Sequence, residues 1–178
     1  GVQTCALPIS STLSGTDCAV YVGISSLDYG TRVLDDLAAM SSHSMTGNTL
    51  SLAANRLSYV FDLHGPSLAV DTACSSSLVA LHHACRANTG EASTALVGGV
   101  NLLLHPYPFV GFTKASMLSA DGRCKAFDAS GNGYVRAEGG AVLLLKPLAQ
   151  AIADGDDIKA VILATGVNAD GARKTGIT

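Results

Sequence analysis

The chain has 178 residues, a length typical of one domain or part of a larger one, with 48% hydrophobic and 14% charged residues and a formal net charge of −3. A mean hydropathy of +0.34 excludes intrinsic disorder, because so much apolar surface can be buried to offset the entropy lost on ordering. The absence of a basic cluster excludes nucleic-acid binding driven by phosphate charge, and no apolar run approaches the ~20 residues of a membrane-spanning helix.

We interpret residues 1–14 as a non-native leader. The opening residues GVQTCALPIS lack both the basic region and the apolar region of a signal peptide, and they continue poorly into the following sequence. The other end carries no terminating signal. We therefore expect a partial domain over residues 15–178.

The first predicted elements are a strand and an amphipathic helix. Residues Ala19 to Ile24 form a short run of β-formers. A helix is predicted between Met45 and Tyr59 because apolar residues recur there with the i, i+3, i+4, i+7 spacing of a helical face. These residues, which we interpret mainly as core, are Leu50, Ala53, Ala54 and Leu57.

A turn is predicted at His64-Gly65-Pro66, because glycine and proline interrupt regular secondary structure. It separates this helix from the next predicted strand, Ser67 to Thr72. The strand is followed at once by a predicted helix that starts close to Cys74 and runs to about Ala87.

The second half predicts further strands of an α/β fold. A strand is predicted over Ala95 to Asn101, and a polar loop over Asp121 to Gly133. The runs Ala141 to Leu145 and Ile158 to Val167 are near-continuous apolar strands, separated by a short helix from Leu148. Strands without polar alternation indicate burial on both faces, as in parallel or mixed sheets.

The cysteines and histidines show no metal or disulfide pattern. The cysteines are odd in number and have no CxxC spacing, which argues against a disulfide framework or a zinc knuckle and indicates a reducing compartment such as the cytoplasm. They are Cys5, Cys18, Cys74, Cys85 and Cys124. The histidines form no HExxH motif. They are His43, His64, His82, His83 and His105.

The most informative segment places Cys74 between a strand and a helix, with the small residues Ala73 and Ser75 on either side. A nucleophile elbow needs this arrangement, because its sharp turn tolerates only small neighbours. Amides at the helix start would stabilise a thiolate and could donate to an oxyanion. The alternative is a buried structural cysteine, which is common for free thiols. Local chemistry leaves both interpretations open.

The segment DTACSSS, preceded by GPSLAV and followed by LVALHHAC, closely resembles the active-site segment of β-ketoacyl synthase domains of type I polyketide synthases. The resemblance extends from about Gly15 to Thr178, with several further motifs in the family's order. These are TGNTLSLAANRLSYVFDLHGP (46–66), GGVNLLL (98–104), MLSADGRCKAFD (117–128), GYVRAEG (133–139) and VNADG (167–171).

The resemblance implies a thiolase-like fold of αβαβα layers, a homodimer, and decarboxylative Claisen condensation. Cys74 would accept an acyl chain from the phosphopantetheine of an acyl carrier protein and donate it to a carbanion derived from a malonyl-type extender. No bound cofactor or metal is implied. A glutamine in place of Cys74 would indicate a decarboxylating loading domain, so the cysteine favours an elongating type.

The family's two catalytic histidines, in HGTGT-type and N-x-GH-type motifs, and its supporting lysine have no counterpart in this sequence. We interpret His64, His82 and His83 as structural or surface residues, because side chains eight to ten residues from the nucleophile cannot reach back to it. The chain is therefore expected to carry the nucleophile without its acid–base partners and to be inactive alone.

Other motif residues have two interpretations each. Asp170 resembles a family position near the catalytic centre, or is a turn aspartate before a glycine. Arg136 and Glu138 could hold the active-site loop by an ion pair, or have a purely structural role. Gly98-Gly99 indicates close backbone approach at the sheet rather than a phosphate loop, since no lysine follows.

Two other functions stay open. One is a thiolase-superfamily enzyme that condenses coenzyme A thioesters, as chalcone-synthase types do, although the SADGRCKAFD motif argues against it. The other is a non-catalytic truncated domain that only dimerises, which the missing histidine motifs favour for the isolated chain.

Overall fold

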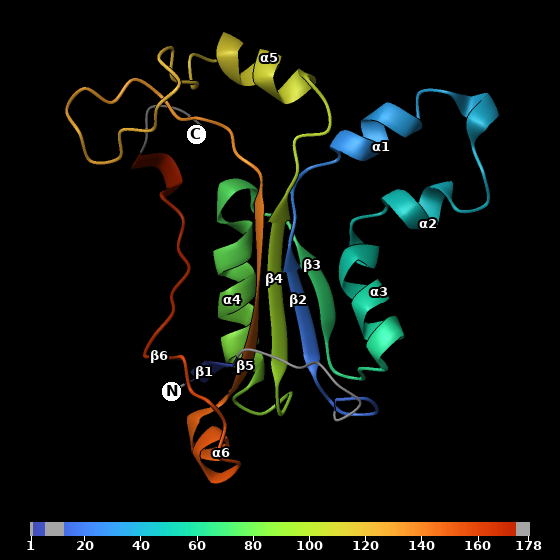
Figure 1. Cartoon of the computed structure of the whole chain (residues 1–178), viewed down its shortest axis with the longest axis vertical. Helices are drawn as coiled ribbons and strands as arrows, with labels where there is room; N and C mark the ends of the chain where they lie inside the picture. Colours follow the sequence, from blue (N-terminus) through green and yellow to red (C-terminus); the bar gives the residue numbers. More distant parts are fainter. Residues whose placement is uncertain (1, 6–12, 174–178) are drawn as a thin grey trace.

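The apolar runs of the sequence form a mixed six-stranded sheet in the computed structural model, which describes residues 2–5 and 13–173 (Figure 1). The order of the strands is β3-β2-β4-β5-β1-β6. Their bounds are β1 Val2–Cys5, β2 Ala19–Gly23, β3 Ser67–Val70, β4 Ala95–Asn101, β5 Gly139–Pro147 and β6 Ala160–Ile162. The helices are α1 Asp28–Val33, α2 Ser44–Asn48, α3 Ser51–Phe61, α4 Ser76–Ala87, α5 Tyr107–Lys114 and α6 Leu148–Ala153, with short 3₁₀ turns at η1 Leu37–Ala39, η2 Ala73–Ser75 and η3 Gly171–Arg173.

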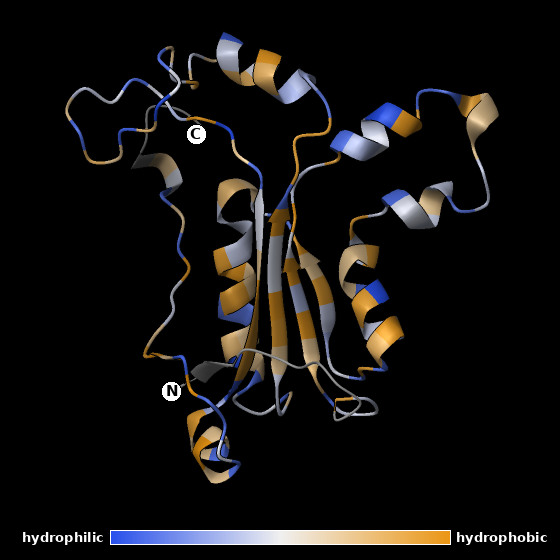
Figure 2. Cartoon of the chain, viewed as in Figure 1, coloured by the Kyte–Doolittle hydropathy of each residue, from blue (hydrophilic) through white to orange (hydrophobic). Residues whose placement is uncertain are grey.

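Helices α4 and α3 cover opposite faces of the central strands (Figure 1). Because successive strand residues point to opposite faces, alternate residues of β2 enter two separate cores. Ala19 and Tyr21 pack with α4, whereas Val20 and Val22 pack on the side of Ala54 in α3. Orange hydrophobic segments therefore line both sides of these strands in Figure 2.

Strands β2, β3 and β4 run parallel, and β5 is antiparallel to β4. The carboxyl ends of parallel strands meet at one edge of a sheet, which is where ligand sites form in open α/β sheets. The loops that follow β2, β3 and β4 are therefore brought together at this edge.

The helix predicted between Met45 and Tyr59 is divided into α2 and α3. Thr49 has an extended backbone with ψ 122°, and its hydroxyl donates to the Met45 carbonyl at 2.7 Å. The Asn48 side chain donates to the Ser44 carbonyl at 2.7 Å. Side chains thus compete for the carbonyls of the preceding turn and end the first helix.

The interpretation of the apolar stripe as core is only partly correct, because Ala54 is fully buried and Ala53 packs beside it, but Leu57 is exposed. The strand predicted over Ile158 to Val167 is also wrong beyond β6. Among the described residues, β6 pairs with β1 at three positions, from Ala160 to Ile162, and Leu163, which follows them, is 90% exposed.

Burial of the strands on both faces is confirmed for β2 but not for β5. Leu145 is fully buried against α4, whereas Val142 on the other face is 65% exposed. Among the described residues, no helix is long and apolar enough to cross a bilayer.

Candidate active site

Cys74 lies in the 3₁₀ turn η2, directly between β3 and α4, as the elbow hypothesis predicts. Ala73 adopts a left-handed conformation with φ 53°, which is costly for a residue other than glycine. A larger side chain at this position would raise the cost further. The sharp turn explains why small residues flank the cysteine.

A set of short hydrogen bonds holds the elbow in this strained shape. The Asp71 carboxylate accepts from the Ala73 amide at 3.0 Å. The buried Ser76 hydroxyl accepts from the Thr72 amide at 2.9 Å and donates to the Ala73 carbonyl at 2.6 Å. The Ser75 hydroxyl donates to the Thr72 carbonyl at 2.9 Å. The hydroxyls of the DTACSSS motif therefore attach the turn to the first residues of α4.

The thiols of the described cysteines differ in their exposure. Cys74 and Cys124 are exposed, whereas Cys18 and Cys85 are buried. Burial raises the pKa of the Cys18 and Cys85 thiols, because a thiolate loses solvation inside the protein. The alternative of a buried structural cysteine therefore describes Cys18 and Cys85, and not Cys74.

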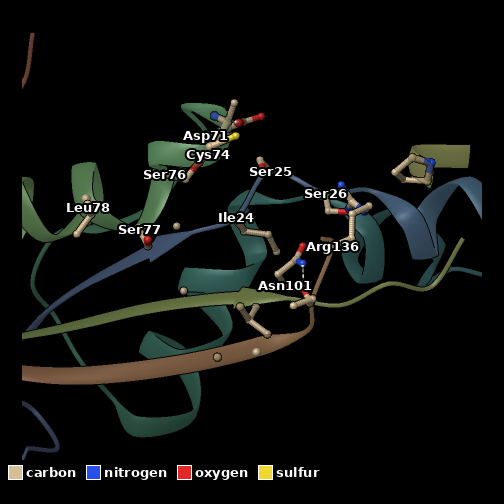
Figure 3. Close-up of a pocket in the computed structure, with 18 of the residues that line it drawn as sticks. Ile24, Ser25, Ser26, Asp71, Cys74, Ser76, Ser77, Leu78, Asn101 and Arg136 are labelled. Carbon is tan, nitrogen blue, oxygen red and sulfur yellow. Dashed lines mark hydrogen bonds between the residues drawn. The ribbon is translucent and has the colours of Figure 1, made fainter. Parts of the chain in front are cut away.

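A cavity of about 1230 Å³ opens in front of Cys74 (Figure 3). It lies at the carboxyl edge of the parallel strands. Its lining includes Asp71, Cys74 and Ser76 from the elbow, Ser26 and Asp28 after β2, and Arg136 before β5. This volume exceeds that of most small-molecule pockets and leaves room for a long chain at the thiol.

The segment between β4 and β5, residues 102–138, carries α5 (Figure 1). This segment lines one side of the cavity with residues such as Tyr107, Phe112 and Tyr134. Its two ends are joined by hydrogen bonds from the Asn101 side chain to the Ala137 carbonyl at 2.6 Å and from the Leu103 amide to the Glu138 carboxylate at 2.9 Å. Arg136 and Glu138 therefore do not act as the ion pair considered above, since each has other contacts.

Arg136 instead stacks on two aromatic rings of α5. Its guanidinium carbon lies 5.5 Å from the Phe109 ring centroid and 5.0 Å from that of Phe112, and its Nη1 donates to the Tyr134 hydroxyl at 3.4 Å. This cation–π contact attaches α5 to the chain that enters β5. The structural role considered for Arg136 is the one observed.

None of the five histidines, all within the described part of the chain, lines the cavity. His64 bonds Asp62 at 2.8 Å, His82 bonds Thr165 at 2.8 Å, and His83 stacks on Tyr21. Asp170 is exposed in the segment after β6 and is not among the residues that line the cavity, so its support of the site stays a prediction.

Ser26, Asp28 and Asn101 also line the cavity, although the sequence did not predict them as members of the site. Asp28 is 3% exposed, and the Ser26 hydroxyl donates to its carboxylate at 2.5 Å. The available signal was positional, because Ser25 and Ser26 directly follow the predicted strand Ala19–Ile24 and Asn101 is the last residue of the predicted strand Ala95–Asn101. Within the described ranges, no group of three or more His, Cys, Asp and Glu side chains is arranged to hold a metal ion.

Comparison with known proteins connects this site with one family. The family model described as "Beta-ketoacyl synthase, N-terminal domain" matches residues 8–151. A polyketide synthase-nonribosomal peptide synthetase of Aspergillus clavatus is 49% identical over an alignment of 179 positions that covers 100% of this chain and 4% of that protein. The polyketide synthase component of lovastatin nonaketide synthase from Aspergillus terreus is 52% identical over 93% of this chain and 6% of its own length.

Solved structures are similar over most of the chain. A cysteine-to-serine mutant of the ketosynthase from module 6 of the bacillaene synthase of Bacillus subtilis 168 has a TM-score of 0.83 and 43% sequence identity. The likeness covers 94% of this chain and 27% of that one. The chain thus spans only a small part of these relatives.

Proposed function

The chain belongs to the β-ketoacyl synthase family, and from this membership we propose that Cys74 carries the acyl group in the decarboxylative Claisen condensation of a polyketide synthase. The mixed α/β layers are those of the N-terminal part of a thiolase-like ketosynthase fold. The observation that carries the proposal is the position of Cys74, an exposed thiol at a strained elbow that opens into a large cavity.

In the first step, the Cys74 thiolate attacks the carbonyl carbon of an acyl thioester held on the phosphopantetheine of an acyl carrier protein. The tetrahedral intermediate then collapses, its carbon–sulfur bond to phosphopantetheine breaks with release of the phosphopantetheine thiolate, and the acyl group stays on Sγ. The first amides of a helix have no partner within the helix, so we assign the Cys74 backbone amide as a donor to the developing oxyanion.

In the second step, a malonyl-type thioester loses CO₂, and the resulting carbanion attacks the carbonyl carbon of the Cys74 thioester. A carbon–carbon bond forms while the bond to Sγ breaks, which restores the thiolate. The proton transfers and the stabilisation of the enolate are assigned to the family's histidine motifs, which this sequence lacks. The complete domain, expected to be a homodimer, is therefore the active form.

The test is the Cys74→Ser variant in a protein that contains the complete domain. Serine is nearly isosteric, but its hydroxyl is a far weaker nucleophile without a dedicated base. We expect condensation between acyl- and malonyl-carrier-protein thioesters to fall more than about 100-fold, or roughly 2.7 kcal/mol of transition-state stabilisation.

The matched control is Cys124→Ser, which changes the other exposed thiol and should leave turnover nearly unchanged. Retention of more than about a hundredth of wild-type turnover by Cys74→Ser would exclude a covalent role for this thiol. Offering the same acyl group on coenzyme A separates a carrier-protein enzyme from one that condenses coenzyme A thioesters.

A further inference from the structure

Two glycines lie side by side beneath the first turn of α4. Gly23 at the end of β2 is paired in register with Gly99 of β4. A Cβ at Gly23 would lie 2.5 Å from the backbone nitrogen and Cα of Ser77, and one at Gly99 would lie 2.9 Å from the Ser77 Cβ. No side chain larger than hydrogen fits at either position without moving the helix.

The rest of the α4 face of these strands is occupied by side chains. Before the glycine pair, Ala19 is paired with Ala95, and Tyr21 with Val97, and all four belong to the core beneath α4. Side chains of these pairs therefore lie between the strands and α4, whereas the glycine pair lets the first turn of α4 approach the strand backbone directly.

This contact is close to the reactive thiol. Ser77 follows Cys74 by three residues, and both line the same cavity (Figure 3). The Ser76 hydroxyl connects the elbow to the helix through the Thr72 amide and the Ala73 carbonyl. A shift of the first turn of α4 would therefore also displace the elbow and Cys74.

We propose that Gly23, Gly99 and Ser77 form a seat that sets the depth of α4 on the sheet and so positions Cys74 for acyl transfer. The expected effect on acyl transfer rests on the proposed function, whereas the packing contact between the two glycines and Ser77 does not. The three residues are positioning residues, because they act through the placement of the thiol. A misplacement of about 1 Å at reacting atoms can cost on the order of 100-fold in rate.

The test replaces Gly99 by alanine in the complete domain and measures acyl transfer from a carrier-protein thioester to Cys74 by mass spectrometry. We expect at least a tenfold slower transfer, while alkylation of Cys74 by iodoacetamide continues. Gly98→Ala is the matched control on the same strand, because a Cβ there would meet only ordinary contacts at 3.7 Å. Its transfer rate should stay within about twofold of wild type.

Ser77→Gly is a second substitution that should restore acyl transfer in Gly99→Ala but not in Gly23→Ala. It removes the Cβ that opposes Gly99, so Gly99→Ala combined with Ser77→Gly should recover most of the transfer rate of Ser77→Gly alone. Gly23→Ala should not be rescued, because its Cβ would oppose the Ser77 backbone. If the double variant recovers neither folding nor transfer, the Ser77 contact is not the cause and the proposal is overturned.

Gly65→Ala controls for simple loss of stability. A Cβ at Gly65 would lie 2.2 Å from the Asp17 carbonyl oxygen, at the amino end of β2, away from the elbow. This variant should lower the thermal midpoint without slowing acyl transfer per folded molecule. Equal rates of acyl transfer in Gly99→Ala and wild type would overturn the proposal that the seat positions Cys74. Absence of acylation in the wild type would overturn the proposed function instead, and rescue of the thermal midpoint by Ser77→Gly would still test the contact.

Discussion

At the scale of single residues, Cys74 is distinguished by its surroundings rather than by its type. We expect it to be the first of the described thiols to react with a substoichiometric alkylating reagent in the complete domain. Cys18 and Cys85 are protected because burial raises their thiol pKa values. Cys124 is the thiol that competes most directly for the reagent, because it is also exposed. Its sulfur, however, accepts a hydrogen bond from the Val135 amide at 3.1 Å. Peptide mapping that finds Cys124 or Cys18 modified first would contradict this assignment.

Asp121, in the loop that precedes β5, is expected to make a contribution to stability that depends on pH. The Lys125 ammonium and the Ser119 hydroxyl both bond its carboxylate, and they lower its pKa to about 2. A lowered pKa means that its contribution to stability is complete above the ordinary carboxyl pKa of about 4 and is lost as the pH falls through about 2.

Carboxyl-carbon NMR titration of the complete domain checks this value. We expect the pKa of Asp121 to rise toward its ordinary value after Lys125→Met, although the Ser119 hydrogen bond still lowers it, whereas Lys159→Met, which removes the partner of Asp157, should leave Asp121 unchanged. An unaltered Asp121 titration in Lys125→Met would show that the ion pair does not hold this loop.

At the scale of elements, α5 depends on Arg136 to close one wall of the cavity. Arg136→Met keeps most of the apolar stem but removes the charge above the Phe109 and Phe112 rings. We expect the free energy of unfolding to fall by about 1–2 kcal/mol, and residues 102–138 to be cleaved faster by protease. Arg123→Met, at an exposed position of the same segment, is the control and should be within about 0.5 kcal/mol of wild type. Equal effects of both variants would refute the cation–π contact.

Elements with a clear local signal could be predicted from the sequence, and those set by side-chain competition or distant pairing could not. The strand beginning at Ala19, predicted from a run of β-formers, and the helix ending at Ala87 are observed where the sequence predicted them. The division at Asn48 and Thr49 depends on side-chain hydrogen bonds that hydrophobic spacing does not report. α5 was not predicted, because its apolar residues are interrupted by Pro108 and Gly111 in only eight residues.

The site likewise contains one residue that the local sequence predicts and others that only the fold brings together. Cys74 could be found from its neighbours, because an elbow is a local structure with small residues and a following helix start. Ser26, Asp28 and Asn101 could not be assigned to it, since their proximity to Cys74 follows from the strand order β3-β2-β4-β5 and not from spacing along the chain.

At the scale of the whole molecule, the 178-residue chain leaves apolar surface uncovered. Leu78, Val142 and Leu163 are exposed, and only 14% of residues are charged. We expect the chain expressed alone to associate or aggregate, because such surface is normally covered by a partner. It should also fail to turn over a malonyl thioester, since losing one oxyanion donor costs about 10²–10³ in rate and both histidine motifs are missing.

Size-exclusion chromatography with a malonyl-carrier-protein decarboxylation assay tests both expectations. The complete domain, examined in parallel, should be a well-defined dimer that is active. A monodisperse and active 178-residue monomer would refute the proposal that catalysis needs the family's histidine motifs.

The central claim, that Cys74 carries the acyl group, is tested most directly by trapping the acyl-enzyme. The complete domain is incubated with an acyl-carrier-protein thioester in the absence of extender, then digested and mapped by mass spectrometry. We expect one acyl group per active site on the peptide that contains Cys74, and none in Cys74→Ser. Stoichiometric acylation of another residue, or an unmodified Cys74 in a domain that still condenses, would contradict it.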